Sequence, residues 1–208
     1  MDLYEFYERR VYPRLLGVAM RPFERYRSAV LQQARGKVLE VGFGTGLNLP
    51  FYPSAVTELT GVDPMVEVPA AMRRRLDESR FPVHRYSSAV EAGLPFEPET
   101  FDCAVVTWTL CSVADPVRGL EEMRRVLRPG APLLFVEHGR SDDPRIVRWQ
   151  QRLNGMWKVI ACGCNLDRAA DQIIEAGGFR IATLDRFDAA GLPRTHGHLY
   201  LGSAFAQR

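Results

Sequence analysis

Lysine is almost absent from this chain of 208 residues: Lys37 and Lys158 are its only lysines, and arginine supplies the other basic side chains. The 27 basic residues are balanced by 25 acidic ones, which gives a formal net charge of +2. A charge this close to zero excludes strong attraction of the whole protein to nucleic acid. Because arginine is used so generally, a single arginine gives weak support for a phosphate site.

Cysteine is also scarce, with four residues at positions 103, 111, 162 and 164. This number is too small for a disulfide scaffold in a chain of this length, so a reducing compartment is expected. Cys162 and Cys164 form a short pair, but neither a CxxC spacing nor a neighbouring histidine cluster accompanies them. The sequence therefore predicts no metal site.

Long hydrophobic runs are lacking as well. Apolar runs such as Leu15–Met20 and Pro132–Val136 are far too short to span a bilayer, and no secretory segment opens the chain. Hydrophobic residues make up 46% and charged residues 25% of the chain, the balance of a globular domain. We expect a cytoplasmic protein that lies at most on a membrane surface.

Short apolar segments with strand character alternate with helical patterns. The predicted strands are Lys37–Val41, Thr60–Val62, Val83–Tyr86, Phe101–Thr107, Leu133–Glu137, Phe179–Leu184 and His198–Phe205. This alternation predicts an α/β fold with a doubly wound, mostly parallel seven-stranded sheet. The last two strands would form an antiparallel edge.

Helical periodicity completes this prediction. The expected helices are two short ones within residues 1–35, broken at Pro13, and then Pro64 to about Glu78, Pro116–Leu127, Pro144–Ala161 and Asp167–Ala176. The residues of 144–161 expected to face inward are Ile146, Trp149, Leu153, Trp157 and Ile160. We predict one domain over 1–208, with a helical lid at 1–35, a cofactor-binding core at 36–138 and acceptor-side elements at 139–208.

A glycine-rich turn follows the first predicted strand, with Gly42, Gly44 and Gly46 placed after an acidic residue, Glu40. Glycines allow a sharp turn and leave room for a ligand against the backbone. In a doubly wound sheet such a turn lies at the carboxyl ends of the strands, where ligands bind. The third glycine comes one position earlier than in dinucleotide-binding turns. This spacing and the acid favour an adenosylmethionine site over a pyrophosphate site, and a plain turn is the structural alternative.

Asp63 ends the second predicted strand. A carboxylate at this position can accept hydrogen bonds from both ribose hydroxyls of a nucleoside, or it can cap the helix expected to start at Pro64. Met65 could pack on an adenine face or belong to the core. The polar residues that follow the third strand, Ser87 and Ser88, could meet the adenine edge or belong to an ordinary loop.

These motifs, together with G-V-D, L-P-F…F-D and V-L-R-P-G, resemble class I S-adenosylmethionine-dependent methyltransferases. Within that class, six segments look like the animal membrane-associated alkyl-thiol methyltransferases and their bacterial relatives, some of them labelled phosphatidylethanolamine N-methyltransferases or grouped with quinone-biosynthesis C-methyltransferases. The segments are Val38–Pro53, Thr109–Val113, Val126–Gly130, Glu137–His138, Trp149–Gln151 and Gly163–Arg168. The resemblance runs along the whole chain.

The resemblance implies S-adenosyl-L-methionine as the cofactor and S-adenosyl-L-homocysteine as its product. It places Glu40, Gly42 and Gly44 along the methionine moiety, with Gly46 in the same turn. It also implies that Asp63 binds the ribose, that Ser88 and Ala89 lie by the adenine, and that Thr107 offers its carbonyl to the methionine amino group. The animal proteins carry a hydrophobic N-terminal anchor that this sequence does not show, so we expect no more than weak contact with a membrane surface.

Methyl transfer from a sulfonium is a direct displacement, so the protein mainly orients the acceptor and excludes water. His138 follows the fifth strand and is the candidate general base, with an ordinary hydrogen-bonded histidine as the alternative. The candidate acceptor-pocket residues are Trp108, Cys111, Asn165 and Arg168. The structural alternative is core packing for Trp108, a helix cap for Asn165 and a position in solvent for Arg168.

The N-terminal segment carries seven arginines and six aromatic side chains, which suit either a lid over the cleft or a helix on a membrane surface. We favour the lid. The sequence predicts a methyltransferase for a small, apolar acceptor, with thiol S-methylation favoured. Phospholipid-headgroup N-methylation, quinone-type C-methylation and a catalytically silent cofactor-binding protein are the alternatives. No nucleic-acid partner is expected, and the oligomeric state is left open.

Overall fold

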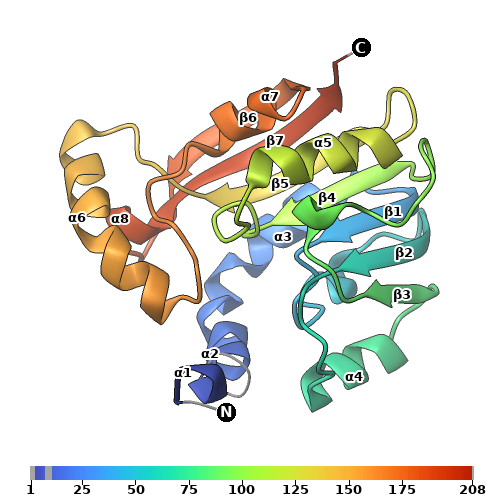
Figure 1. Ribbon diagram of the computed structural model, residues 1–208, viewed down its shortest axis with the longest axis horizontal. Coiled ribbons are helices and arrows are strands. Elements are labelled where there is room, and N and C mark those ends of the chain that lie inside the picture. The colour runs from blue at the N-terminus through green and yellow to red at the C-terminus, as the bar shows by residue number, and fades with distance from the viewer. Residues whose placement is uncertain (1–2, 8–10, 208) are drawn as a thin grey trace.

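The computed structural model describes residues 3–7 and 11–207, and a seven-stranded sheet runs through its centre (Figure 1). The strands are β1 (Gly36–Val41), β2 (Val56–Val62), β3 (Val83–Tyr86), β4 (Cys103–Thr107), β5 (Pro132–His138), β6 (Phe179–Asp188) and β7 (His198–Ala206). Their order across the sheet is β3-β2-β1-β4-β5-β7-β6. The first strand, β1, therefore lies in the middle of the sheet, and the later strands are added on both sides of it, which confirms the predicted doubly wound sheet.

The first five strands are parallel to one another, whereas β7 is antiparallel to both β5 and β6. Val41 of β1 pairs with Val62 of β2 and with Val106 of β4, and Thr107 pairs with Val136 of β5. The carboxyl ends of these four strands consequently meet at one edge. This edge is where ligands bind in doubly wound sheets.

Helices cover both faces of the sheet. The α-helices are α1 (Leu3–Phe6), α2 (Tyr12–Ala19), α3 (Glu24–Leu31), α4 (Ala70–Asp77), α5 (Pro116–Val126), α6 (Pro144–Ile160), α7 (Ala170–Ala176) and α8 (Arg194–Gly197), and short 3-10 turns lie at Arg21–Phe23, Leu49–Phe51 and Val90–Ala92. α5 and α7 bury Leu120, Met123 and Ile174 on one face (Figure 1). α3 and α4 bury Leu31 and Met72 on the other.

Several predicted boundaries were wrong. The helix expected from Pro64 begins only at Ala70, and the helix expected from Asp167 begins at Ala170. β2 starts earlier than predicted, at Val56, and β6 continues to Asp188. The predicted break at Pro13 does not appear as such, because Pro13 lies in the first turn of α2, where its missing N–H costs nothing. A second interruption lies at Arg21–Phe23.

The inward face predicted for α6 was also partly wrong. Trp149 and Ile160 are 54% and 46% exposed, whereas the neighbouring Gln150 is fully buried. α6 packs on the end of the sheet next to α8 rather than over a face, so hydrophobic periodicity does not mark its contact side (Figure 1). Within residues 3–7 and 11–207, no helix combines the length and the apolar character needed to cross a bilayer.

Candidate functional site

The turn after β1 has the backbone shape that its glycines predicted. Gly42, Gly44 and Gly46 all have positive φ, at 78°, 52° and 73°. A Cβ on Gly42 would lie 2.0 Å from Oγ1 of Thr109, whereas a Cβ on Gly44 would find no atom closer than 3.9 Å. Gly42 is therefore needed for close packing inside the protein. Gly44 leaves an open cradle of bare backbone at the carboxyl edge of the sheet.

Asp63 joins this turn to the segment after β2. Its Oδ2 accepts the N–H of Gly44 at 2.8 Å, and its Oδ1 accepts the N–H of Met65 at 2.8 Å. Because α4 starts at Ala70, Asp63 does not cap a helix, and that alternative was wrong. The half-buried carboxylate lies beside the open backbone of Gly44, as a ribose-binding acid must.

The residues predicted to surround the adenine lie on the two neighbouring loops. Arg85 and Ser87 donate hydrogen bonds to the carbonyl of Met65, at 3.0 and 3.2 Å, and so tie the loop after β3 to the segment after β2. Met65, Ser88 and Ala89 are all half-buried. The structure thus brings these residues to the same edge as Asp63, and their contact with the cofactor stays a prediction.

Glu40 is completely enclosed by protein. Its carboxylate accepts hydrogen bonds from Nδ2 of Asn48 at 3.0 Å and from the hydroxyl of Tyr52 at 2.7 Å. Burial raises the pKa of this carboxyl to about 7, although these two donors and nearby Arg27 oppose the rise. Glu40 therefore holds the segment after the glycine turn, and its predicted contact with the methionine moiety stays a prediction.

Arg27 of α3 is a site residue that the sequence did not reveal. Its Nη1 donates to Oδ1 of Asn48 at 2.6 Å and to Oγ1 of Thr107 at 2.9 Å. Burial lowers the pKa of this guanidinium to about 10, while Glu40 and Glu137 oppose the fall. As one of seven arginines in the first 35 residues, Arg27 had no feature that set it apart.

Trp108 follows β4 in a strained conformation. Its φ is 51°, in the left-handed region that bulky residues avoid. The guanidinium of Arg27 lies 4.5 Å from its ring centroid, and Phe23 packs edge-on at 5.2 Å. Within the described residues, its indole N–H is buried and has no hydrogen-bond partner. Strain and an unpaired donor are both typical of ligand sites, which agrees with the predicted pocket role.

The loop Thr109–Val113 is held from two sides. Glu137 accepts the N–H of Thr109 at 2.8 Å, and Asn165 donates to the carbonyl of Cys111 at 2.8 Å. Arg168 donates to the carbonyl of Val113 at 2.7 Å and also to that of Leu110. Asn165 and Arg168, predicted as pocket residues, thus bind main-chain carbonyls of this loop. Their direct contact with an acceptor stays a prediction.

The side chain of Cys111, which belongs to this loop, lies close to two side chains from distant parts of the sequence, His138 and Cys164. Nε2 of His138 lies 2.9 Å from Sγ of Cys164, and the indole N–H of Trp157 donates to the same sulfur at 3.3 Å. The ligand atoms of Cys111, His138 and Cys164 all lie within 4.8 Å of one another. A hydrogen bond from Cys111 lowers the pKa of the Cys164 thiol. The candidate base His138 therefore lies close to the thiols of both Cys111 and Cys164.

The sequence is similar to those of known proteins. The model of a methyltransferase domain matches residues 39–135. Human thiol S-methyltransferase TMT1B is 35% identical over 161 residues, which cover 75% of this chain and 66% of that protein. A phosphatidylethanolamine N-methyltransferase from Cereibacter sphaeroides is 39% identical over 120 residues, covering 57% of this chain and 59% of that protein.

A solved structure agrees with these matches. The Burkholderia thailandensis 1,6-didemethyltoxoflavin-N1-methyltransferase superposes with a TM-score of 0.69 at 17% identity, over 98% of this chain and 86% of that one, and it contains S-adenosylhomocysteine. The chain carries a class I S-adenosylmethionine-dependent methyltransferase domain. S-adenosyl-L-methionine is its cofactor, and the open backbone at Gly44 beside Asp63 fits it. The chain spans less than two thirds of the length of the curated relatives named above.

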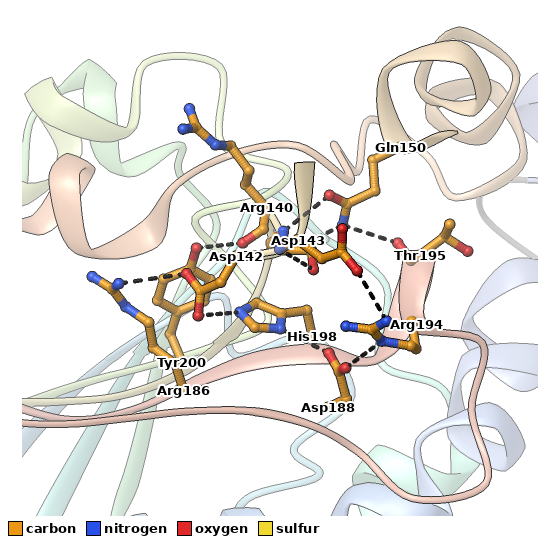
Figure 2. A network of polar contacts seen from close by, with 12 residues as sticks. Arg140, Asp142, Asp143, Gln150, Arg186, Asp188, Arg194, Thr195, His198 and Tyr200 are labelled. Carbon is orange, nitrogen blue, oxygen red and sulfur yellow. Dashed lines mark hydrogen bonds and ion pairs between the residues drawn. The ribbon is translucent and has the colours of Figure 1, made fainter. Parts of the chain in front are cut away.

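A polar network connects α6 with the segment that follows β5 (Figure 2). Gln150, the buried residue of the Trp149–Gln151 motif, donates to the carbonyl of Gly139 at 2.9 Å and to that of Thr195 at 3.1 Å. It also accepts the N–H of Ser141 at 3.0 Å. This amide therefore locks α6 to the residue that follows His138, and so holds the end of β5 in place.

The N-terminal segment contacts the far end of α6. The hydroxyl of Tyr7 donates to the carbonyl of Ile160 at 2.7 Å, and the hydroxyl of Tyr12 donates to that of Ala161 at 3.3 Å. The last carbonyls of a helix have no partner within it, and the hydroxyl of Tyr7 supplies one for Ile160. The carbonyl of Ala161 also accepts the N–H of Cys164, at 3.1 Å. The N-terminal helices and the C-terminal end of α6 therefore lie next to each other (Figure 1).

Proposed function

We propose that this chain transfers the methyl group of S-adenosyl-L-methionine to a small, apolar thiol. The open backbone of Gly44, hydrogen-bonded to the carboxylate of Asp63 at the ends of β1 and β2, carries the cofactor half of the proposal. The identities of 34% and 35% to thiol S-methyltransferases from rat and human support the acceptor half.

In the proposed mechanism the cofactor lies across the ends of β1, β2 and β4. The Gly42–Gly46 turn faces its methionine part, Asp63 accepts hydrogen bonds from its ribose, and Ser88 and Ala89 lie beside its adenine. The acceptor thiol would give its proton to His138, and its sulfur would attack the methyl carbon as the carbon–sulfonium bond breaks. The electrons of that bond would stay on the sulfur of S-adenosylhomocysteine, and a thioether would result. The protein orients the two sulfurs and keeps water away, which is the main requirement of a direct displacement.

His138 is the residue that we propose to activate the acceptor. It is buried, it ends β5 beside the loop Thr109–Val113, and its ring contacts a sulfur. Trp108, which directly precedes this loop, and Cys111, which lies within it, would line the acceptor pocket. Asn165 and Arg168 would keep this wall in place through their bonds to the main chain of the loop.

Calorimetric titration with S-adenosylhomocysteine tests the cofactor half. The unaltered chain should bind it, and Asp63→Ala should lose much of the affinity. A panel of alkyl thiols, quinols and phosphatidylethanolamine vesicles, each with labelled cofactor, tests the acceptor half. Transfer to thiols is expected. Binding of S-adenosylhomocysteine without transfer to any acceptor would instead indicate a silent cofactor-binding protein.

Phosphatidylethanolamine N-methylation is the second candidate. It is favoured by the 39% identity to the Cereibacter sphaeroides protein of that name. Large apolar side chains on α1, α2 and α6 are exposed, with Leu3 at 85%, Val18 at 61% and Val159 at 60%. These side chains would suit an enzyme that takes its acceptor from a lipid surface. Label in the vesicle lipid and none in the thiols would establish this function instead.

We also propose that the N-terminal helices form a lid over the cleft. The contacts of Tyr7 and Tyr12 with α6, and the reach of Arg27 to Thr107 at the end of β4, support this role. Sedimentation with anionic vesicles tests the alternative of a surface helix. A lid predicts no salt-sensitive pelleting, and pelleting that high salt reverses would overturn it.

A further inference from the structure

The cluster of Cys111, His138 and Cys164 has the composition of a metal centre. Among His, Cys, Asp and Glu side chains of the described residues, this is the set whose ligand atoms come close enough together to hold an ion. Cys111 lies in the loop after β4, His138 ends β5, and Cys164 follows α6. All three are buried, at 3%, 8% and 7% exposure. Two thiols and an imidazole are the ligands that zinc prefers.

The spacing of these atoms is close to that of a tetrahedral zinc site. With Zn–S near 2.3 Å and Zn–N near 2.0 Å, two ligand atoms in such a site lie roughly 3.5 to 3.8 Å apart. In the cluster, the sulfurs of Cys111 and Cys164 and the ring nitrogen of His138 lie no more than 4.8 Å from one another, which is about 1 Å above this spacing. The 2.9 Å contact between His138 and Cys164 must lengthen by about 0.7 Å, which small rotations of the two side chains can supply.

The surroundings of the cluster match those of a metal site. Two thiolates with a zinc ion are neutral together, so burial carries no net charge into the protein interior. The indole of Trp157 donates to the sulfur of Cys164, and Asn165 holds the main chain of Cys111. Such outer contacts orient metal ligands. Gln150 in turn fixes Gly139, the residue after His138.

We propose that Cys111, His138 and Cys164 bind one zinc ion, and that the thiol acceptor of the proposed function occupies its fourth position. Three protein ligands with an open position are typical of catalytic zinc, whereas structural zinc has four. The proposal rests on the proposed thiol methylation. It replaces the expectation of no metal, which considered only the spacing of Cys162 and Cys164.

The zinc ion would activate the acceptor in a balanced sequence. Binding of a thiol to zinc releases its proton to solvent and leaves a metal-bound thiolate. The lone pair of this sulfur attacks the methyl carbon of the cofactor, and the electrons of the carbon–sulfonium bond remain on the sulfur of S-adenosylhomocysteine. The neutral thioether binds zinc weakly and leaves. His138 then acts through the metal and does not itself accept the proton.

Metal content of the full chain, purified under reducing conditions and incubated with zinc sulfate, tests the site. We expect one zinc per chain by mass spectrometry. Cys164→Ser should weaken zinc binding by more than about 100-fold, and Trp157→Phe by about 10- to 100-fold. Cys162→Ser is the matched control, two positions away and outside the ligand set, and should bind zinc as the unaltered chain does. Unchanged binding of S-adenosylhomocysteine to each variant shows that it is folded.

Cobalt substitution tests the open position. Tetrahedral cobalt with two thiolates absorbs strongly in the visible range, and addition of an alkyl thiol should shift these bands if the thiol becomes a ligand. A spectrum unmoved by thiols would overturn the role in activation. No metal binding, or a Cys111–Cys164 disulfide found by peptide mapping in its place, would overturn the site itself.

The two proposals can fail separately. Thiol methylation that persists unchanged in metal-free protein, after chelator treatment and dialysis, would refute the zinc proposal and leave the proposed function standing. Zinc bound as expected, with no methyl transfer to any thiol, would refute thiol methylation. The metal readout itself requires no turnover.

Discussion

The buried carboxyl of Glu40 should make the stability of this protein depend on pH in an unusual direction. Burial raises the pKa of Glu40 from 4.5 to about 7, with Arg27, Tyr52 and Asn48 opposing the rise. Between these two pH values the folded chain binds a proton that the unfolded chain releases. Stability from this group is therefore fully retained below pH 4.5 and decreases as pH rises toward 7.

The size of the effect follows from the shift. A difference of about 2.5 pH units corresponds to on the order of 3 kcal/mol of unfolding free energy, a large part of the usual total of about 5 to 15 kcal/mol. Glu40→Gln has nearly the same shape but stays neutral. Altered hydrogen bonds should lower its unfolding free energy by about 1 kcal/mol at every pH. As the pH rises from 5 to 8, the unaltered chain should lose about 2 to 3 kcal/mol that the variant does not lose, so the difference between the two unfolding free energies should change by this amount in favour of the variant.

Urea unfolding at pH 5, 6, 7 and 8, without cofactor, measures this difference. Glu121→Gln is the matched control, because its side chain on α5 is 45% exposed and its ion pair with Arg118 is a surface pair. Its curve should run parallel to that of the unaltered chain. Parallel curves for Glu40→Gln as well would show that Glu40 is ionised throughout, and the reasoning from burial would be refuted.

Four further substitutions test the site. In Gly44→Ala the new Cβ has open space, so the variant should lose only about 1 to 2 kcal/mol of stability, and calorimetry should mainly show weaker S-adenosylhomocysteine binding. In Gly42→Ala the new Cβ would collide with Thr109, so this variant should unfold at a clearly lower urea concentration. Asn165→Ala should cost about 1 kcal/mol and slow methyl transfer with little change in S-adenosylhomocysteine affinity; a large loss of affinity would contradict its role in holding the loop. Gln150→Ala leaves two buried main-chain groups and one half-buried group without this partner. It should lower the unfolding free energy by about 2 to 3 kcal/mol in urea titration, and a loss below 1 kcal/mol would contradict the network of Figure 2.

The features of local origin were predictable. Positive φ at Gly42, Gly44 and Gly46 follows from the residue type, and Asp63 comes directly after β2, next to Pro64, as its place in the sequence predicted. The parallel arrangement of the first five strands agrees with the long connections between them, two of which contain the helices α4 and α5. Local signals failed where a segment packs in an unusual way, as in α6, whose buried residue is Gln150 and whose Trp149 faces solvent.

The remaining features depended on contacts between distant residues. Arg27 reaches Thr107 across 80 positions, and Cys111, His138 and Cys164 meet from three separate segments. The spacing of these residues in the sequence does not predict their contacts, because the contacts form only when the sheet brings the ends of its strands together.

By itself, therefore, the sequence determined the doubly wound sheet, the glycine turn and the acid beside it, since each depends on the conformational preferences of a few adjacent residues. Only the tertiary structure decided which arginine enters the site, which glutamine is buried, and that two thiols and an imidazole share one pocket. The physical reason is that these groups owe their positions to burial and to partners far along the chain.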